Sequence, residues 1–317
     1  MSRSSSVSVS TPCKVHLLGE WAVIWGKPAL LTAVDLRITV SLAPSSSIVI
    51  ARSEATKQSD SLKSIIEPIV KKELKIKTIP PYKLEIDSQI PMGAHLGSSA
   101  AVSVASIAAL LTFLKVKWDL ELINKLAYEA EKQLQGNPSG ADNSTIVYGG
   151  LIWFRKETED LKIIQLLDIK FSRSKNFVLI HTGTPKLTTK QMIAQITADF
   201  EKNPSLKDKF LNSQEKLTRE LLTAIKDANE KEVIRIIREG EKNLESIGVC
   251  SPEVKKIIRQ IESSGGAAKI CGAGAFSGPT GVLLCYHKNP SIIQNIAKSH
   301  NLSYFKAALG VEGLRQE

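Results

Sequence analysis

The sequence predicts an α+β protein built from two packed domains. Segments of strand-like composition are grouped in the first half and near the end of the chain, and they alternate too irregularly with helices for a doubly wound sheet. From about residue 187 to 263 the pattern is almost wholly helical. A chain of 317 residues is long enough for two domains. We therefore expect an N-terminal domain over residues 1–180 and a C-terminal domain over 181–317.

The first half is expected to start with β-strands and to continue with helices. Runs rich in branched and apolar residues, or with alternating apolar and polar residues, predict strands. Ser61 is a candidate N-cap for the first helix, although Pro68 interrupts its pattern. The strands are expected at 14–19, 29–40, 46–52 and 82–90, and the helices at 59–75, 100–114 and 119–135.

The second half is expected to be mainly helical, with strands at both of its ends. The segment TIVYGGLIWF (145–154) predicts a short helix that runs into a strand, and 176–183 predicts another strand. Ser251-Pro252 is a favourable helix start, because serine caps the N terminus and proline fits the first turn. Helices are expected at 188–200, 205–228, 230–248, 251–264 and 290–298, and strands at 267–271, 280–286 and 302–309.

Composition and charge argue against several classes of function. The net charge is +10, but Lys and Arg are interleaved with Glu along helices and no RNA- or DNA-binding motif occurs, so we expect no nucleic-acid partner. The longest apolar run, 100–114, contains Ser103, Ser106 and Thr112, so we expect no membrane span. The start of the chain lacks the apolar region of a secretory signal, and the four cysteines form no metal-binding pattern. These features predict a cytoplasmic protein with reduced thiols, whose positive field attracts anions such as nucleoside triphosphates.

One segment, PMGAHLGSSAAVSVASIAALL (91–111), places Gly-Ser-Ser at the start of a helix that is otherwise apolar. A helix begins with unpaired N–H groups and the positive end of its dipole, and glycine lets a ligand approach the backbone closely. This combination suits phosphate binding, but a buried helix with a serine cap would look similar. No GxxxxGK[ST] motif occurs, and GAGAFSG (272–278) does not fit GxGxxG.

Four segments together resemble the GHMP family of small-molecule kinases. PMGAHLGSSAA (91–101) is similar to the family's phosphate-binding loop, P-x-G-x-G-L-G-S-S-A-A. PCKVHLLGEWAVIWGKPAL (12–30), EKQLQGNPSGADNSTIVYGG (131–150) and AAKICGAGAFSGPTGVLL (267–284) resemble further motifs in the family's order, with mevalonate kinases the most similar members. The resemblance implies the two-domain GHMP kinase fold, with an N-terminal domain like ribosomal protein S5 domain 2 and a ferredoxin-like α/β C-terminal domain. It also implies ATP-dependent phosphorylation of the primary hydroxyl of mevalonate.

The resemblance assigns the catalytic and metal-binding roles to four residues. Asp142 would accept the proton of the substrate hydroxyl, and the Lys14 ammonium beside it would lower its pKa and spread the transition-state charge. Glu131 would hold Mg²⁺ together with the hydroxyl of Ser99. From the residues alone, Asp142 could instead cap a helix and Glu131 could be solvated. The residues implied in ATP binding are Pro91, Gly93, His95, Leu96, Gly97, Ser98, Ser99, Ala100, Gly272, Ala273 and Gly274.

The acceptor side of the site is less closely matched. The residues implied in binding the acceptor are Lys14, Glu20, Trp21, Asp142, Thr184 and Thr188, with the choice of threonine within 184–189 open. Trp21 stands where the family has His, His95 and Cys13 each replace a Gly, and Cys271 and Phe276 alter the third motif. The alternatives are therefore a GHMP kinase for another small alcohol, such as phosphomevalonate or homoserine, or a non-catalytic nucleotide-binding protein. A homodimer is also left open.

Overall fold

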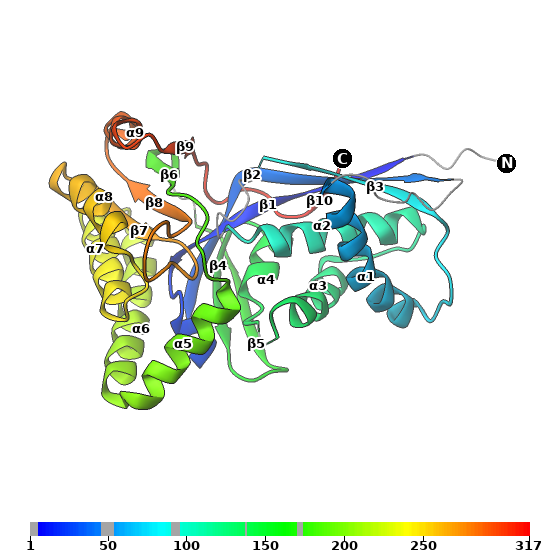
Figure 1. Cartoon of the computed structure of the whole chain (residues 1–317), viewed down its shortest axis with the longest axis horizontal. Helices are drawn as coiled ribbons and strands as arrows, with labels where there is room; N and C mark the ends of the chain where they lie inside the picture. The colour runs from blue at the N-terminus through cyan, green and yellow to red at the C-terminus, as the bar shows by residue number, and fades with distance from the viewer. Residues whose placement is uncertain (1–5, 46–53, 90–95, 137, 170–173) are drawn as a thin grey trace.

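The computed structural model describes residues 6–45, 54–89, 96–136, 138–169 and 174–317. Two antiparallel sheets lie side by side along the longest axis of the molecule, and each carries its own group of helices (Figure 1). Grouped strands and helices of this kind confirm the predicted α+β class.

The first sheet is built around two long strands from the start of the chain. β1 (Val7–Leu18) pairs with β2 (Ala29–Pro44) over nearly its whole length, and β3 (Tyr82–Ser88) pairs with the outer half of β2. β4 (Leu151–Lys156) pairs with the first residues of β2 and with β5 (Lys162–Leu167). β1 begins earlier and β2 ends later than the sequence pattern predicts, whereas β3 ends two residues earlier than expected, and the expected strand at 46–52 lies outside the described residues.

The helices α1 to α4 cover one face of this sheet (Figure 1). The central helix, α2 (Ser98–Phe113), is apolar on all sides and packs on β1 and β2, which confirms the predicted buried helix. The surrounding helices are α1 (Glu54–Leu74), α3 (Leu120–Gln135) and α4 (Ala141–Tyr148). α1 continues through Pro68, since the buried side chains beside that residue anchor the helix in the core.

The second sheet has the strand order β7-β8-β6-β9 and carries the long helical segment of the chain. Its strands are β6 (Phe177–His181), β7 (Ala267–Ile270), β8 (Val282–Tyr286) and β9 (Ser303–Lys306). Its helices are α5 (Thr189–Lys202), α6 (Pro204–Lys226), α7 (Glu230–Ser246), α8 (Pro252–Ser263) and α9 (Pro290–Ser299). Ser251 caps α8 as predicted, since its hydroxyl accepts a hydrogen bond from the Val254 N–H.

The two halves are joined by packing and by the chain itself. Gly240 of α7 lies so close to Leu18 at the end of β1 that a Cβ on this glycine would be 2.3 Å from the leucine side chain. After β9 the chain returns to the first sheet, where β10 (Arg315–Gln316) pairs with β1. The two halves therefore pack against each other where α7 meets β1.

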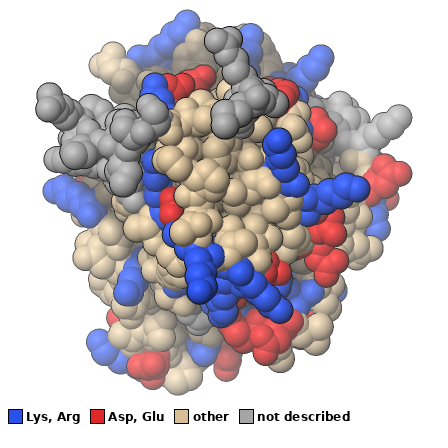
Figure 2. All heavy atoms as spheres, turned by 90° about the vertical axis from the view of Figure 1, so that its right-hand side faces the viewer, with Lys and Arg blue, Asp and Glu red and all other residues tan. Residues whose placement is uncertain are grey.

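Among the described residues, the charged side chains at the end of the molecule that carries α1 and β3 are of both signs (Figure 2). Figure 2 shows Lys and Arg interspersed with Asp and Glu around the edge of this face. Among the described residues, no helix combines the length and apolar character needed to cross a bilayer.

Candidate active site

A cavity of about 220 Å³ lies where the sequence motifs meet. Its walls come from the end of β1 and the turn after it, the N terminus of α2, the C-terminal part of α3, the turn before α4, the start of α5 and the loop after β7. Segments that are distant in sequence thus surround one space. The polar residues of the lining are Lys14, His16, Glu20, Ser98, Ser99, Glu131, Ser139, Asp142, Asn143 and Thr189.

The N terminus of α2 opens into this cavity. Gly97 precedes the helix with φ of 76°, a left-handed conformation that glycine adopts at little cost, and among the described residues no side-chain cap is found at this N terminus. A Cβ on Gly97 would be 2.9 Å from Cε of Lys14, so glycine leaves room for the lysine side chain without any shift of it. The uncapped N–H groups and the helix dipole together suit an anion such as a phosphate group.

The other residues predicted to bind ATP do not all line the cavity. Ser98 and Ser99 line the cavity, whereas Leu96 and Ala100 are buried, and the carbonyl of Leu96 accepts a hydrogen bond from the Lys14 N–H at 3.0 Å. Pro91, Gly93 and His95 lie outside the described residues.

Ser99 and Glu131 form a pair of oxygen donors beside the helix N terminus. The Ser99 hydroxyl donates a hydrogen bond to Oε1 of Glu131 at 3.2 Å, and Glu131 is buried near the end of α3. Hydroxyl and carboxylate oxygens are the hard ligands that Mg²⁺ prefers, and Mg²⁺ sites commonly combine one or two such groups with phosphate oxygens. The two residues therefore fit the predicted metal site.

Asp142 lies in the first turn of α4 and contacts two side chains of β1. Lys14 Nζ is 2.8 Å from Oδ1 of Asp142, and His16 Nε2 is 3.4 Å from the same oxygen. Burial alone would raise the pKa of Asp142, but Lys14 and His16 together hold this pKa well below its usual range. Asp142 is therefore a carboxylate at neutral pH, and a third of its side chain is exposed.

His16 is a site residue that the sequence reasoning missed. Successive side chains of a strand point to opposite faces, so positions 14 and 16 share the face of β1 that looks at Asp142. That two-residue period is the signal that could have found it. Burial and the Lys14 charge lower the pKa of His16, so the ring is neutral at pH 7.

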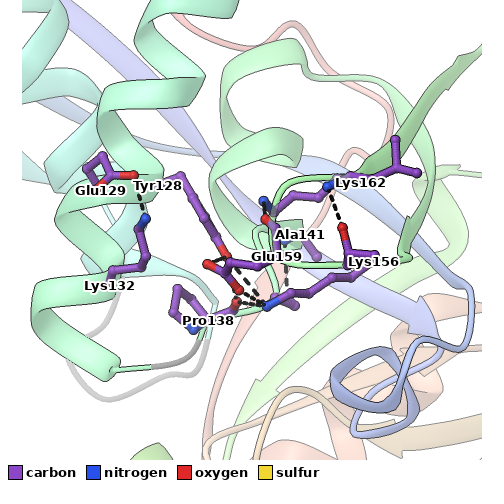
Figure 3. Close-up of polar contacts among 11 residues, drawn as sticks. Tyr128, Glu129, Lys132, Pro138, Ala141, Lys156, Glu159 and Lys162 are labelled. Atoms are coloured by element: carbon purple, nitrogen blue, oxygen red, sulfur yellow. Dashed lines mark hydrogen bonds and ion pairs between the residues drawn. The ribbon is translucent and has the colours of Figure 1, made fainter.

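The turn before α4 is held by residues of α3 and of the β4–β5 hairpin (Figure 3). The Pro138 carbonyl accepts a hydrogen bond from Lys156 Nζ at 3.2 Å, and the Tyr128 hydroxyl oxygen lies 3.3 Å from it. Glu159 accepts from both of these donors, at 2.7 Å from Lys156 and 2.8 Å from Tyr128. Lys162 Nζ lies 3.8 Å from the centre of the Tyr128 ring, a cation–π contact. This cluster fixes the position from which α4 presents Asp142, and no sequence motif indicated it.

Glu20 pairs with a lysine other than Lys14. Its Oε1 accepts a hydrogen bond from Lys269 Nζ, which also donates to the carbonyls of Ile270 at 2.8 Å and His16 at 3.2 Å. Both members of the ion pair are buried, and the structure gives Glu20 Oε2 no hydrogen-bond partner among the described residues. Trp21 follows with φ of 62°, and its buried indole N–H likewise has no partner in the described part of the chain.

The C-terminal half contributes the remaining wall of the cavity. Gly272 and Ala273 line it, whereas a Cβ on Gly274 would be 2.0 Å from the carbonyl oxygen of Val249, so this glycine serves loop packing. Of the threonines, Thr188 caps α5 through a capping box with Gln191.

Within the threonine-rich segment 184–189, the residue that lines the cavity is the one after the N-cap of α5. Thr189 and Ile193 of α5 line the cavity, whereas Thr184 and Thr188 are exposed outside its lining. Thr189 is therefore the threonine of this segment that lines the cavity.

Comparison with known proteins agrees with these motifs. The family described as "GHMP kinases N terminal domain" matches residues 61–150, and "GHMP kinases C terminal" matches residues 221–301. The chain is 32% identical to the mevalonate kinase of Archaeoglobus fulgidus, over 84% of this chain and 88% of that protein. It is 26% identical to the mevalonate kinase of Methanothermobacter thermautotrophicus, over 97% of this chain and 99% of that protein.

Solved structures show the same fold. The mevalonate kinase of Methanococcus jannaschii superposes with a TM-score of 0.78 at 22% identity, covering 97% of this chain and 99% of that one. The phosphomevalonate kinase of Streptococcus pneumoniae, in complex with phosphomevalonate and AMPPNP, gives a TM-score of 0.77 at 19% identity, covering 95% and 99%. The fold is therefore shared by kinases with different acceptors. Motifs, fold and sequence similarity agree, and the chain belongs to the GHMP kinase family.

Proposed function

We propose that this protein transfers the γ-phosphoryl group of ATP to the primary hydroxyl of mevalonate, giving 5-phosphomevalonate. The observation that carries the proposal is the Lys14–Asp142 ion pair of 2.8 Å in a cavity that also receives the open N terminus of α2. The similarity to relatives named mevalonate kinase over most of the chain supports mevalonate as the acceptor.

The nucleotide side of the cavity binds the triphosphate in this proposal. The N–H groups at the start of α2 donate hydrogen bonds to phosphate oxygens. The side chains of Ser99 and Glu131 would hold Mg²⁺. When bound, the ion neutralises charge on the phosphoryl oxygens. Gly272 and Ala273 complete the wall that faces this helix end.

Asp142 and Lys14 act on the acceptor hydroxyl. The hydroxyl oxygen forms a bond to the γ-phosphorus, the bond from that phosphorus to the β–γ bridging oxygen of ATP breaks, and the hydroxyl proton passes to Asp142. A carboxylate with so low a pKa is a weak base, so it orients the hydroxyl first and accepts the proton late, as a loose transition state allows. The Lys14 ammonium then offsets negative charge as it develops.

The acceptor lies on the opposite side of Asp142 from α2 in this proposal. Trp21 and Ile193 give this part of the wall an apolar surface, and Thr189 supplies a hydroxyl group. We also propose a cytoplasmic location, because Cys13, Cys250, Cys271 and Cys285 are all buried free thiols, as is usual in a reducing compartment.

The test is an ADP-release assay with mevalonate, phosphomevalonate, homoserine and galactose as acceptors. We expect kcat/KM for mevalonate to exceed the others by about 100-fold or more, since the site must pair the acceptor's polar groups. The Asp142→Asn variant is the control for activity that depends on this site. A preference for another alcohol would overturn the acceptor, and ATP binding without turnover of any of the four would favour the non-catalytic alternative.

A further inference from the structure

His16 stands beside Asp142 in a position that the mechanism above leaves unused. It lies two residues after Lys14 on β1, only 5% of its surface is exposed, and its Nε2 approaches the same Asp142 oxygen that Lys14 binds. The other ring nitrogen, Nδ1, is buried and has no hydrogen-bond partner among the described residues. Its contact with Asp142 is therefore the only hydrogen bond that the structure gives the ring within the described chain.

The charged groups around His16 determine its protonation state. Lys14 lies on the same strand, Asp142 faces the ring from α4, Glu20 follows β1, and Lys269 of β7 donates to the His16 carbonyl oxygen. Burial and Lys14 lower the pKa of the ring more than the carboxylates raise it, so the imidazole is neutral. Because a carboxylate can only accept, the ring proton belongs on Nε2 and is donated to Asp142.

Two donors that meet at one oxygen constrain the carboxylate in a way that one cannot. The terminal torsion of an aspartate is broad, and a lysine is a point charge on a flexible stem, so Lys14 alone leaves the carboxylate plane free to turn. The imidazole is rigid and approaches Oδ1 from the same strand. No hydrogen bond to Oδ2 of Asp142 is found among the described residues, and this side chain is partly exposed where it lines the cavity.

We infer that His16 is a positioning residue for phosphoryl transfer: with Lys14 it holds Oδ1 of Asp142, so that Oδ2 is presented to the acceptor hydroxyl. The inference rests on the proposed function, because it needs Asp142 to accept the hydroxyl proton. A neutral donor suits this task, since it fixes the carboxylate without adding a second full positive charge that would weaken the base further.

The first test compares His16→Leu with His16→Gln. Leucine removes the donor while filling similar space, and the glutamine amide nitrogen can reach the place of Nε2. We expect kcat to fall by about 10-fold in His16→Leu and by less than about 3-fold in His16→Gln, with KM for ATP unchanged in both. The matched control is His300→Gln, an exposed histidine that bonds Gln260. Equal kcat in the wild type and His16→Leu would overturn the inference.

The pH profile of kcat separates positioning from general packing. Protonation of His16 would put a second cation beside Lys14, so wild-type kcat should fall on the acid side as the ring is charged, below its ordinary pKa of 6.5. In His16→Gln this acid limb should move to lower pH, because no ring remains to titrate. An unchanged limb would overturn the assigned role.

A substrate-free measurement distinguishes failure of this inference from failure of the proposed function. Nitrogen-detected NMR of the histidine rings should show His16 as the neutral tautomer with its proton on Nε2, and Asp142→Asn should lower the ring pKa. Loss of the corresponding signal in His16→Gln assigns it. If this coupling is present but mevalonate is not phosphorylated, the proposed function fails. If mevalonate is phosphorylated and the ring is insensitive to Asp142→Asn, the inference fails.

Discussion

Two lysine–carboxylate pairs lie within the same part of the molecule and differ in almost everything except their chemistry. Lys14 pairs with Asp142 at the wall of the cavity, where a third of the aspartate side chain is exposed. Lys269 pairs with Glu20 where the two sheets meet, and these side chains are 0% and 1% exposed. Both lysines come from strands, and both carboxylates come from segments outside those strands.

The two pairs differ in how many hydrogen bonds the lysine ammonium donates inside the protein. Lys269 donates to Glu20 and to the carbonyls of His16 and Ile270, so its three donors are all occupied inside the protein. Burial would lower the pKa of Lys269, but the neighbouring Glu20 carboxylate more than offsets this and leaves it raised. Glu20 and Asp142 both line the cavity, but Glu20 is almost fully buried, whereas a third of the Asp142 side chain is exposed and can still meet a ligand. One pair therefore joins the two halves, whereas the other is available for chemistry.

The largest expected effect is loss of catalysis when the Lys14–Asp142 pair, here called the cavity pair, is broken. Asp142→Asn keeps the shape of the side chain but cannot accept a proton, so kcat for mevalonate should fall by roughly 10² to 10⁴-fold. ATP affinity should stay nearly intact, because the asparagine does not touch the open end of α2. Steady-state kinetics and nucleotide titration measure the two quantities. A variant with wild-type kcat would remove Asp142 from the reaction.

The next largest effect is loss of stability when the buried Lys269–Glu20 pair is broken. Lys269→Met leaves the Glu20 carboxylate buried without its cation, which should lower the free energy of unfolding by about 3 to 5 kcal/mol. Adding Glu20→Gln removes the uncompensated charge, so the double variant should recover much of this loss. Urea denaturation measures both.

The cavity pair supplies the matched control for this stability experiment. Lys14→Met should reduce kcat strongly and stability less, because water in the cavity can solvate the partly exposed Asp142. Equal destabilisation by Lys14→Met and Lys269→Met would show that the greater burial of the Lys269–Glu20 pair does not make it the more important pair for stability.

The sequence was sufficient for one of these pairs and not for the other. Lys14 and Asp142 each stand inside a motif, and the geometry brings them together at 2.8 Å. Glu20 and Lys269 also stand in motif segments, but Lys269 was assigned no role, because a lysine in a short apolar strand gives no sign of which carboxylate it will meet. Long-range pairing of this kind depends on how the two sheets dock, which local patterns do not encode.

Elements of secondary structure were predicted better than their ends. The buried helix over 100–114 followed from its all-round apolar character, and the helical stretch of the second half from its periodicity. β1 starts at Val7, well before the predicted strand, since its serine-rich outer half is stabilised by pairing with β2 and β10, and not by its own composition. The cluster of Tyr128, Lys156 and Glu159 was also missed, because it depends on tertiary contacts and not on local sequence patterns.

A third buried carboxylate shows what happens without a cation in contact. Glu241 of α7 accepts a hydrogen bond from the Ile270 N–H at 2.9 Å, while its Oε1 has no partner among the described residues. Burial raises the pKa of Glu241 to about 7, the reverse of the shift at Asp142. In the folded state the group therefore holds its proton at pH values where it is ionised after unfolding.

This raised pKa gives the protein a specific pH dependence of stability. The stabilising contribution of protonated Glu241 is fully present below about pH 4.5 and is lost as the pH rises towards 7. Glu241→Gln should flatten that part of the stability curve and raise the free energy of unfolding at pH 8 by roughly 2 to 3 kcal/mol. Denaturation at pH 5 and pH 8 measures the difference, and an identical pH slope in both proteins would contradict the assignment.

The smallest effect comes from disturbing the cavity pair without changing either member. A methyl group on Gly97 would be 2.9 Å from Cε of Lys14, and the flexible lysine stem can move away from it. Gly97→Ala should therefore cost only about 1 kcal/mol of stability, mostly from the left-handed backbone, and should lower kcat several-fold by moving Nζ from Asp142. Gly278→Ala is the matched control, since Gly278 has a similar φ of 69° and no atom within 4 Å of the added methyl. If both variants lose the same stability but only Gly97→Ala loses kcat, with KM for ATP unchanged, the catalytic cost arises at Lys14 and not from backbone strain or phosphate binding. Equal kcat in the two variants would show that the Lys14–Asp142 distance is not what limits the reaction.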